Sequence, residues 1–263
     1  GGINSAGLAI VNAVLNTDED IDTDHGEFMH AVLSNHDSIT GDLDASLQIY
    51  IEEYVLDANF ILISGEYLWL LEKNNDGEYE FELVEDLYQC RSNFLISDVN
   101  TDQEYAVHRQ EYCENVLVGI AGTNNLNEIN ILNSMLRSFK KSTGAIYPIP
   151  YPNQVLGAGS PNGYIDTRYS VNRDNNVSTL LFRGAMAGED IIGTMWTILG
   201  NASSGIAVPV WPIGELPYVL TGNSGNQAPM EYINHQIKDR LYSWENQDDN
   251  GTTREEDFID SYQ

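Results

Sequence analysis

The chain has 263 residues, 42% of them hydrophobic, so it can bury a core as one large domain or two small ones. Its 40 acidic residues outnumber its 12 basic ones, which gives a formal net charge of −28 at pH 7. A field of this sign repels nucleic-acid phosphates and anionic membranes, which argues against both as partners. The acidity favours a solvated surface suited to salty or divalent-rich surroundings, with cation-binding carboxylate clusters as the alternative.

The first segment, GGINSAGLAIVNAVL, carries an apolar run at 8–11 that predicts a buried strand. The acidic stretch NTDEDIDTDHGE follows, with aspartates at every second position: Asp18, Asp20, Asp22 and Asp24. An EF-hand loop counted from Asp20 needs Gly sixth and Glu twelfth, but Gly26 is seventh and Ala31 is twelfth. A solvated acidic loop is therefore favoured over a calcium site.

Apolar residues at three- and four-residue spacings predict two short helices, in 26–36 and 42–55. The period then changes to that of strands in 58–65, 67–85 and 91–98. Asn75-Asp76-Gly77 is a strong hairpin signal between two alternating runs. Together these segments predict an antiparallel meander from about 58 to 98.

The second half of the chain predicts more helices and more strands. A helix pair is expected from about 103 to 142, broken at Thr123-Asn124-Asn125, and a Pro- and Gly-rich loop or linker follows at 147–164. Strands are expected in 177–185, 194–201 and 206–211, and a last helix in 228–244. This order favours an α+β layered sandwich over a doubly wound parallel sheet. We expect one domain over 1–245 and an acidic polar tail over 246–263.

Signatures of cofactor and metal sites are lacking. The sequence has no Gly-rich phosphate loop, no Cys-x-x-Cys and no His-Glu-x-x-His, and His30 and His36 lie six apart, which does not place them on one helix face. We therefore expect no metal and no cofactor. No apolar run reaches the roughly 18 to 20 residues that span a bilayer. With two cysteines, at most one disulfide can form.

Neither cysteine is a convincing nucleophile. Cys113 falls inside a helical pattern, where a small core residue is the simpler interpretation. Cys90 is next to Arg91, and a neighbouring cation can lower a thiol pKa, but no histidine lies near it in sequence. The serines of GNSG and GAGS do not match a nucleophile elbow.

Three stretches carry a family resemblance: GGINSAGLAIVNAVL; DANFILISG followed by RSNFLIS; and NRDNNVSTLLFRGAMAGEDIIGTMWTILGNASSGIAVPVW. Together they resemble the acyl-coenzyme A:6-aminopenicillanic acid acyltransferase-like family, a branch of the N-terminal-nucleophile hydrolases related to choloylglycine hydrolases. The resemblance extends over about residues 1 to 215, loosely between 100 and 165. It implies a four-layer αββα sandwich and cleavage or transfer at a linear amide by a Cys that autoproteolysis exposes at a new N-terminus.

The same resemblance implies site residues. Asn93 is the best candidate for the oxyanion donor and Asn59 the second, while Arg173 would be the arginine that positions the substrate or the surroundings of the nucleophile. The simpler interpretations are that Asn93 hydrogen-bonds a strand end and that Arg173 forms a surface salt bridge. Trp196 and Trp211 are either core aromatics or lining of an acyl pocket.

One departure from the family sets the functional expectations. In the family the nucleophilic Cys and its strands precede the segment with which this sequence starts, so we expect them on a separate upstream fragment that forms a heterodimer with this chain. The alternative is an inactive member that serves as a secreted structural, filament or binding subunit, and a homo-oligomer is a further option for the partner. A weaker third option is a calcium-dependent adhesion module at Asp18 to Asp24. We expect an extracellular or periplasmic location, and the sequence does not identify the amide substrate.

Overall fold

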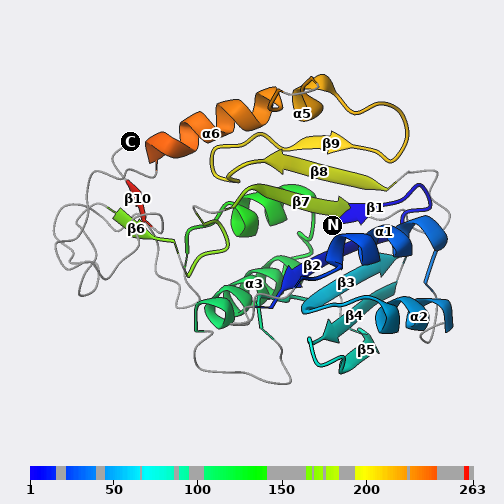
Figure 1. Cartoon of the computed structure of the whole chain (residues 1–263). Coiled ribbons are helices and arrows are strands. Elements are labelled where there is room, and N and C mark those ends of the chain that lie inside the picture. Colours follow the sequence, from blue (N-terminus) through cyan, green and yellow to red (C-terminus); the bar gives the residue numbers. More distant parts are fainter. Residues whose placement is uncertain are drawn as a thin grey trace. The chain divides into compact units, whose positions relative to one another are not determined.

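Figure 1 shows the computed structural model of the chain. It describes residues 1–15, 22–39, 45–65, 67–85, 89–94, 104–140, 164–167, 169–173, 176–183, 193–223, 226–241 and 258–260. The chain forms two compact units, each assembled from separated stretches. The first comprises Gly1–Val107, Leu180–Trp196 and Pro209–Gly214, and the second comprises His108–Thr179, Thr197–Val208 and Glu215–Gln263. Of the predicted tail at 246–263, all but Phe258–Asp260 lies outside the described residues.

The first unit contains a five-stranded antiparallel sheet in the order β1-β2-β3-β4-β5. Its strands are β1 (Gly2–Ile3), β2 (Ala9–Val14), β3 (Ala58–Ser64), β4 (Tyr67–Lys73) and β5 (Tyr79–Leu83). The predicted hairpin joins β4 to β5: the Gly77 N–H donates to the Asn74 carbonyl at 3.1 Å, and Gly77 has a φ of 85°, which glycine adopts without strain. The predicted meander is therefore confirmed for β3 to β5.

Residues 91–94 differ from the prediction. They were expected to form a strand with 95–98, but Arg91–Phe94 has no strand conformation, and 95–98 lie outside the described residues. Side chains of the sheet hold this segment, as described below for Asn59, so tertiary contacts override its local strand preference.

Two helices, α1 (His25–Asn35) and α2 (Ala45–Glu53), form the main hydrophobic core with one face of the sheet (Figure 1). Because strand side chains alternate in direction, β3 contributes Ala58, Phe60 and Leu62 to this core. Phe28 of α1 meets Phe60 edge-on, with ring centroids 4.9 Å apart. Both predicted helices are thus confirmed within the described residues.

The opposite face of the sheet carries different side chains. Alternation directs Asn59, Ile61 and Ile63 of β3 away from the core, together with Leu70 and Glu72 of β4. Asn59 and Glu72 are direct cross-strand partners in the β3–β4 register. Two polar residues thus lie side by side on this face.

A second antiparallel sheet has the order β7-β8-β9, with β7 (Ser178–Arg183), β8 (Thr194–Leu199) and β9 (Val208–Val210). All three strands fall inside segments that the sequence predicts as strands. β6 (Tyr164–Asp166) pairs with β10 (Phe258–Asp260) in the second unit. Within the described residues the fold is therefore a mixed α+β arrangement with two larger antiparallel sheets.

Of the remaining helices, all but the short one at Tyr218–Thr221 lie in segments that the sequence predicts as helical. The remaining helices are α3 (Glu104–Gly122), α4 (Glu128–Ile131), α5 (Tyr218–Thr221) and α6 (Pro229–Leu241), and a π-helical stretch, Leu132–Leu136, continues α4. α3 ends close to the predicted break, where Asn124 has a φ of 55°. Within the described ranges, no helix combines the length and the apolar character needed to cross a bilayer.

Candidate functional site

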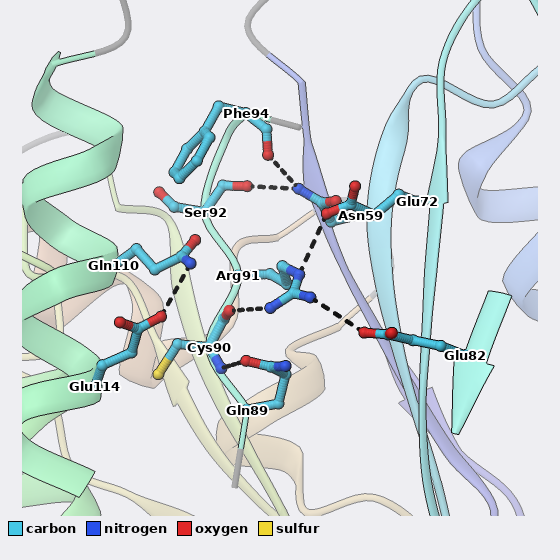
Figure 2. Close-up of polar contacts among 10 residues, drawn as sticks. All are labelled: Asn59, Glu72, Glu82, Gln89, Cys90, Arg91, Ser92, Phe94, Gln110 and Glu114. Carbon is cyan, nitrogen blue, oxygen red and sulfur yellow. Dashed lines mark hydrogen bonds and ion pairs between the residues drawn. The ribbon is translucent and has the colours of Figure 1, made fainter. Parts of the chain in front are cut away.

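The face of the five-stranded sheet opposite α1 and α2 holds a cluster of residues with polar contacts, which we call the polar face: Asn59, Glu72 and the segment Gln89–Phe94 (Figure 2). Asn59 is 1% exposed and Glu72 is 6% exposed. A buried amide and a buried carboxylate are expensive unless other groups satisfy them. Their partners therefore define what this face can do.

Asn59 donates both of its side-chain N–H groups to backbone carbonyls. Its Nδ2 donates to the Ser92 carbonyl at 2.9 Å and to the Phe94 carbonyl at 2.7 Å (Figure 2). An asparagine amide has two N–H donors, so none is left for an oxyanion in this arrangement. Its Oδ1 has no hydrogen-bond partner among the described residues, which costs about 1–3 kcal/mol for a buried acceptor.

Asn93 lies between the two carbonyls that Asn59 holds. It is half-buried, and its Nδ2 donates to the carbonyl of Val14, at the end of β2, at 2.6 Å. The simpler sequence-based interpretation, a hydrogen bond to a strand end, is therefore observed. The structure also brings together the two asparagines predicted as oxyanion donors, because Asn59 bonds the residues on either side of Asn93.

Arg91 neutralises the buried carboxylate of Glu72. Its Nε lies 3.4 Å from Glu72 Oε1, and each side chain is only 7% exposed. Its Nη2 lies 3.7 Å from the more exposed Glu82, and its Nη1 donates to the Cys90 carbonyl at 2.9 Å. The guanidinium that the sequence places beside Cys90 is thus engaged by carboxylates and a carbonyl, while Cys90 itself is buried and forms no disulfide.

The two candidate tryptophans differ in exposure. Trp196 lies on β8 and is half-buried. Trp211 follows β9, is 51% exposed, and donates from Nε1 to Thr194 Oγ1 at 3.1 Å. The interpretation of Trp211 as a core aromatic is therefore wrong, since half of its surface faces solvent.

Arg173 belongs to the second unit, whereas Asn59 and Asn93 belong to the first. It precedes β7 in an irregular stretch, and its carbonyl accepts a hydrogen bond from Asn201 Nδ2 at 2.7 Å. Its guanidinium acts on Arg109 of α3: burial first, and then the charge of Arg173, lower the pKa of Arg109 to about 9, while Cys113 acts in the opposite direction. The structure thus groups Arg173 with Arg109 and Cys113.

Asn172 is one of the buried amides that sequence reasoning did not single out. Asn172 is 0% exposed, and neither its Nδ2 nor its Oδ1 has a hydrogen-bond partner among the described residues. It is the first residue of a stretch that carries the family resemblance, but there the resemblance assigns a role to the neighbouring Arg173 and none to Asn172. Its backbone N–H lies 3.4 Å from the Ser138 carbonyl, which attaches this stretch to the end of the π-helical segment.

Metal-ligand geometry is lacking in the part of the chain that the structure describes. No group of three or more His, Cys, Asp or Glu side chains there could hold an ion. Asp18 and Asp20 of the acidic stretch lie outside the described residues. Asp24 instead accepts the Val55 N–H through Oδ2 at 2.9 Å and links the start of α1 to the end of α2.

Comparison with known proteins adds no family. No family model, no curated protein and no solved structure matches this chain.

Proposed function

We propose that this chain forms the scaffold and the oxyanion-binding face of a Cys-dependent hydrolase or acyltransferase acting on linear amides. In this proposal the fold is a four-layer αββα sandwich of the N-terminal-nucleophile type, and a separate fragment of the same precursor supplies the nucleophilic Cys. The sequence motifs around Asn59, Asn93 and Arg173 suggest this chemistry. An extracellular or periplasmic location is part of the same proposal.

The observation that carries the proposal is the placement of Asn93. Its two neighbouring carbonyls are held from β3, and its own amide is held at the end of β2. Catalysis of acyl transfer relies on donors that are fixed before the charge develops, because a fixed dipole needs no reorganisation during the reaction. A residue whose side chain is tethered once and whose two chain neighbours are each held by a hydrogen bond meets that requirement better than a side chain on a mobile loop.

The reaction follows from the groups assigned. The Cys thiol gives its proton to the terminal amine, and the thiolate attacks the acyl carbon while amide donors bind the resulting oxyanion. The C–N bond then breaks, the leaving amine takes the proton, and a thioester remains. Water completes hydrolysis and regenerates the thiol, whereas a second amine completes acyl transfer.

The test uses the processed protein made from the complete gene and a panel of linear amides: penicillins, conjugated bile acids, acylated lactone signals and small peptides. We expect hydrolysis that iodoacetamide abolishes. Asn93→Ala should lower kcat by about 10²–10³, as loss of one oxyanion donor does. Asn115→Ala, at an exposed position of α3, is the matched control and should leave kcat unchanged. Equal activity of Asn93→Ala and the control would contradict the assignment.

A second function, a non-catalytic assembly subunit, is favoured by a different observation. β1 pairs only Gly2 with Ile10 and Ile3 with Ala9, so within the described residues the rest of β2 has no strand on that side. An open strand edge can accept a strand from another molecule. Sedimentation velocity decides: association that is lost in Val14→Lys, a change at an exposed edge position, supports this function, and a monomer at all concentrations rejects it.

A further inference from the structure

We propose that Asn59 is a positioning residue that sets the location of Asn93 by holding the backbone carbonyls of both its chain neighbours. This inference rests on the proposed function, because there Asn93 is the oxyanion donor. It replaces the expectation that Asn59 itself donates to the oxyanion, since both of its N–H groups are occupied.

Two hydrogen bonds from the Asn59 side chain, to the carbonyls of Ser92 and Phe94, form what we call the clamp. The carbonyls of Ser92 and Phe94 flank Asn93, and both accept from the same Nδ2, at 2.9 and 2.7 Å. A single side chain therefore holds the peptide unit that precedes Asn93 and the peptide unit that follows Phe94. That side chain projects from the middle strand of the five-stranded sheet and is 1% exposed, so its own position is well defined.

A third contact comes from the neighbouring strand. Asn93 Nδ2 donates to Val14, the residue after Ala13, and Ala13 is the direct partner of Asn59 in the β2–β3 register. The clamp and the tether thus act from adjacent positions of two paired strands. Because Arg91–Phe94 has no strand conformation, no ladder of its own keeps it in place, and side-chain bonds take over that task.

The residue type suits this role. Asparagine offers two donors on one planar group at the end of a short side chain, whereas aspartate would direct oxygens at both carbonyls and alanine would leave them without donors. The orphaned Oδ1 of Asn59 points to the same conclusion, because stability alone would disfavour a buried acceptor without a partner at this position.

The first test does not depend on activity. In the processed protein, hydrogen–deuterium exchange of the peptide covering 89–94 and the side-chain amide resonance of Asn93 are compared between wild type and Asn59→Ala. Leu62→Ala is the control, since Leu62 is fully buried on the same strand but in the core with α1 and α2. We expect exchange in 89–94 to rise at least about tenfold and the Asn93 resonance to shift in Asn59→Ala only. Asn59→Ser keeps one hydrogen-bond donor, so its exchange rate in 89–94 should lie between those of wild type and Asn59→Ala. The same variant replaces Asn59→Ala in this test if Asn59→Ala does not fold.

The second test is a double-mutant cycle in kcat. A displacement of about 1 Å at a reacting group can cost about 10²-fold, so Asn59→Ala should lower kcat by about 10- to 100-fold with KM changed less than about threefold. If Asn59 acts through Asn93, adding Asn59→Ala to Asn93→Ala should cause no further loss. Losses that multiply, or exchange in 89–94 equal to that of Leu62→Ala, would overturn the inference. An inactive wild type would overturn the proposed function instead, and the exchange experiment would then decide on the clamp alone.

Discussion

Replacing Arg91 by Met tests the energetics of the polar face. Arg91 is the cation that lies against Glu72, and both side chains are 7% exposed. Glu82 lies at a similar distance from the same guanidinium, but it is 48% exposed. Water can therefore take over as the partner of Glu82 but not of Glu72.

The expected cost can be worked out from this difference. Breaking a buried ion pair by removing one partner typically costs about 3–5 kcal/mol. We therefore expect Arg91→Met to lower the free energy of unfolding by about 3–5 kcal/mol. Glu82→Gln should change it by less than about 0.5 kcal/mol.

Urea unfolding at pH 7, followed by circular dichroism, provides the measurement. Glu72→Leu combined with Arg91→Met replaces the pair by apolar groups and should recover most of the loss. A cost below about 1 kcal/mol would refute the reasoning. The same conclusion would follow if Glu82→Gln were as damaging as Arg91→Met.

Two more predictions concern buried polar groups elsewhere. Asn234 of α6 donates to the Leu199 and Asn201 carbonyls and accepts a hydrogen bond from Ser204. At about 1 kcal/mol per hydrogen bond, Asn234→Ala should lower the free energy of unfolding by about 3 kcal/mol, whereas Gln236→Ala, at an exposed position of the same helix, should leave it unchanged. Equal urea midpoints for the two variants would contradict this prediction. Burial lowers the pKa of His25, against the charges of Asp57 and Asp24, so the unfolded chain binds this proton first and stability should fall as pH drops below about 6.5. His25→Gln should reduce that pH dependence, and an NMR titration of His25 that gave a pKa at or above 6.5 would count against it.

Local patterns predicted much of the first unit. The alternation around Asn59 and the Asn-Asp-Gly turn predicted β3 to β5, and helical spacing predicted α1 and α2. The same alternation places Asn59 on the face opposite Phe60. These features depend on neighbours in the sequence, so a pattern over a few residues contains them.

The contacts of the polar face depend on residues far apart in the chain. Residues 91–94 have the composition of a strand, yet the side chain of Asn59, which lies 33 to 35 positions earlier in the chain, holds the carbonyls of Ser92 and Phe94. Likewise, Arg91 is beside Cys90 in sequence, but its charge is balanced by Glu72 on another strand. No local pattern indicates such partners, because they follow from strand register and from the path of the chain after β5.

The central claim is that the protein is a processed, Cys-dependent amidohydrolase or acyltransferase. The most direct measurement is a denaturing intact-mass spectrum of the protein purified after expression of the complete gene, with N-terminal sequencing of every species. The account predicts this chain together with a second, smaller chain that begins with Cys and is alkylated by iodoacetamide at that residue. A single polypeptide with no N-terminal Cys would contradict it.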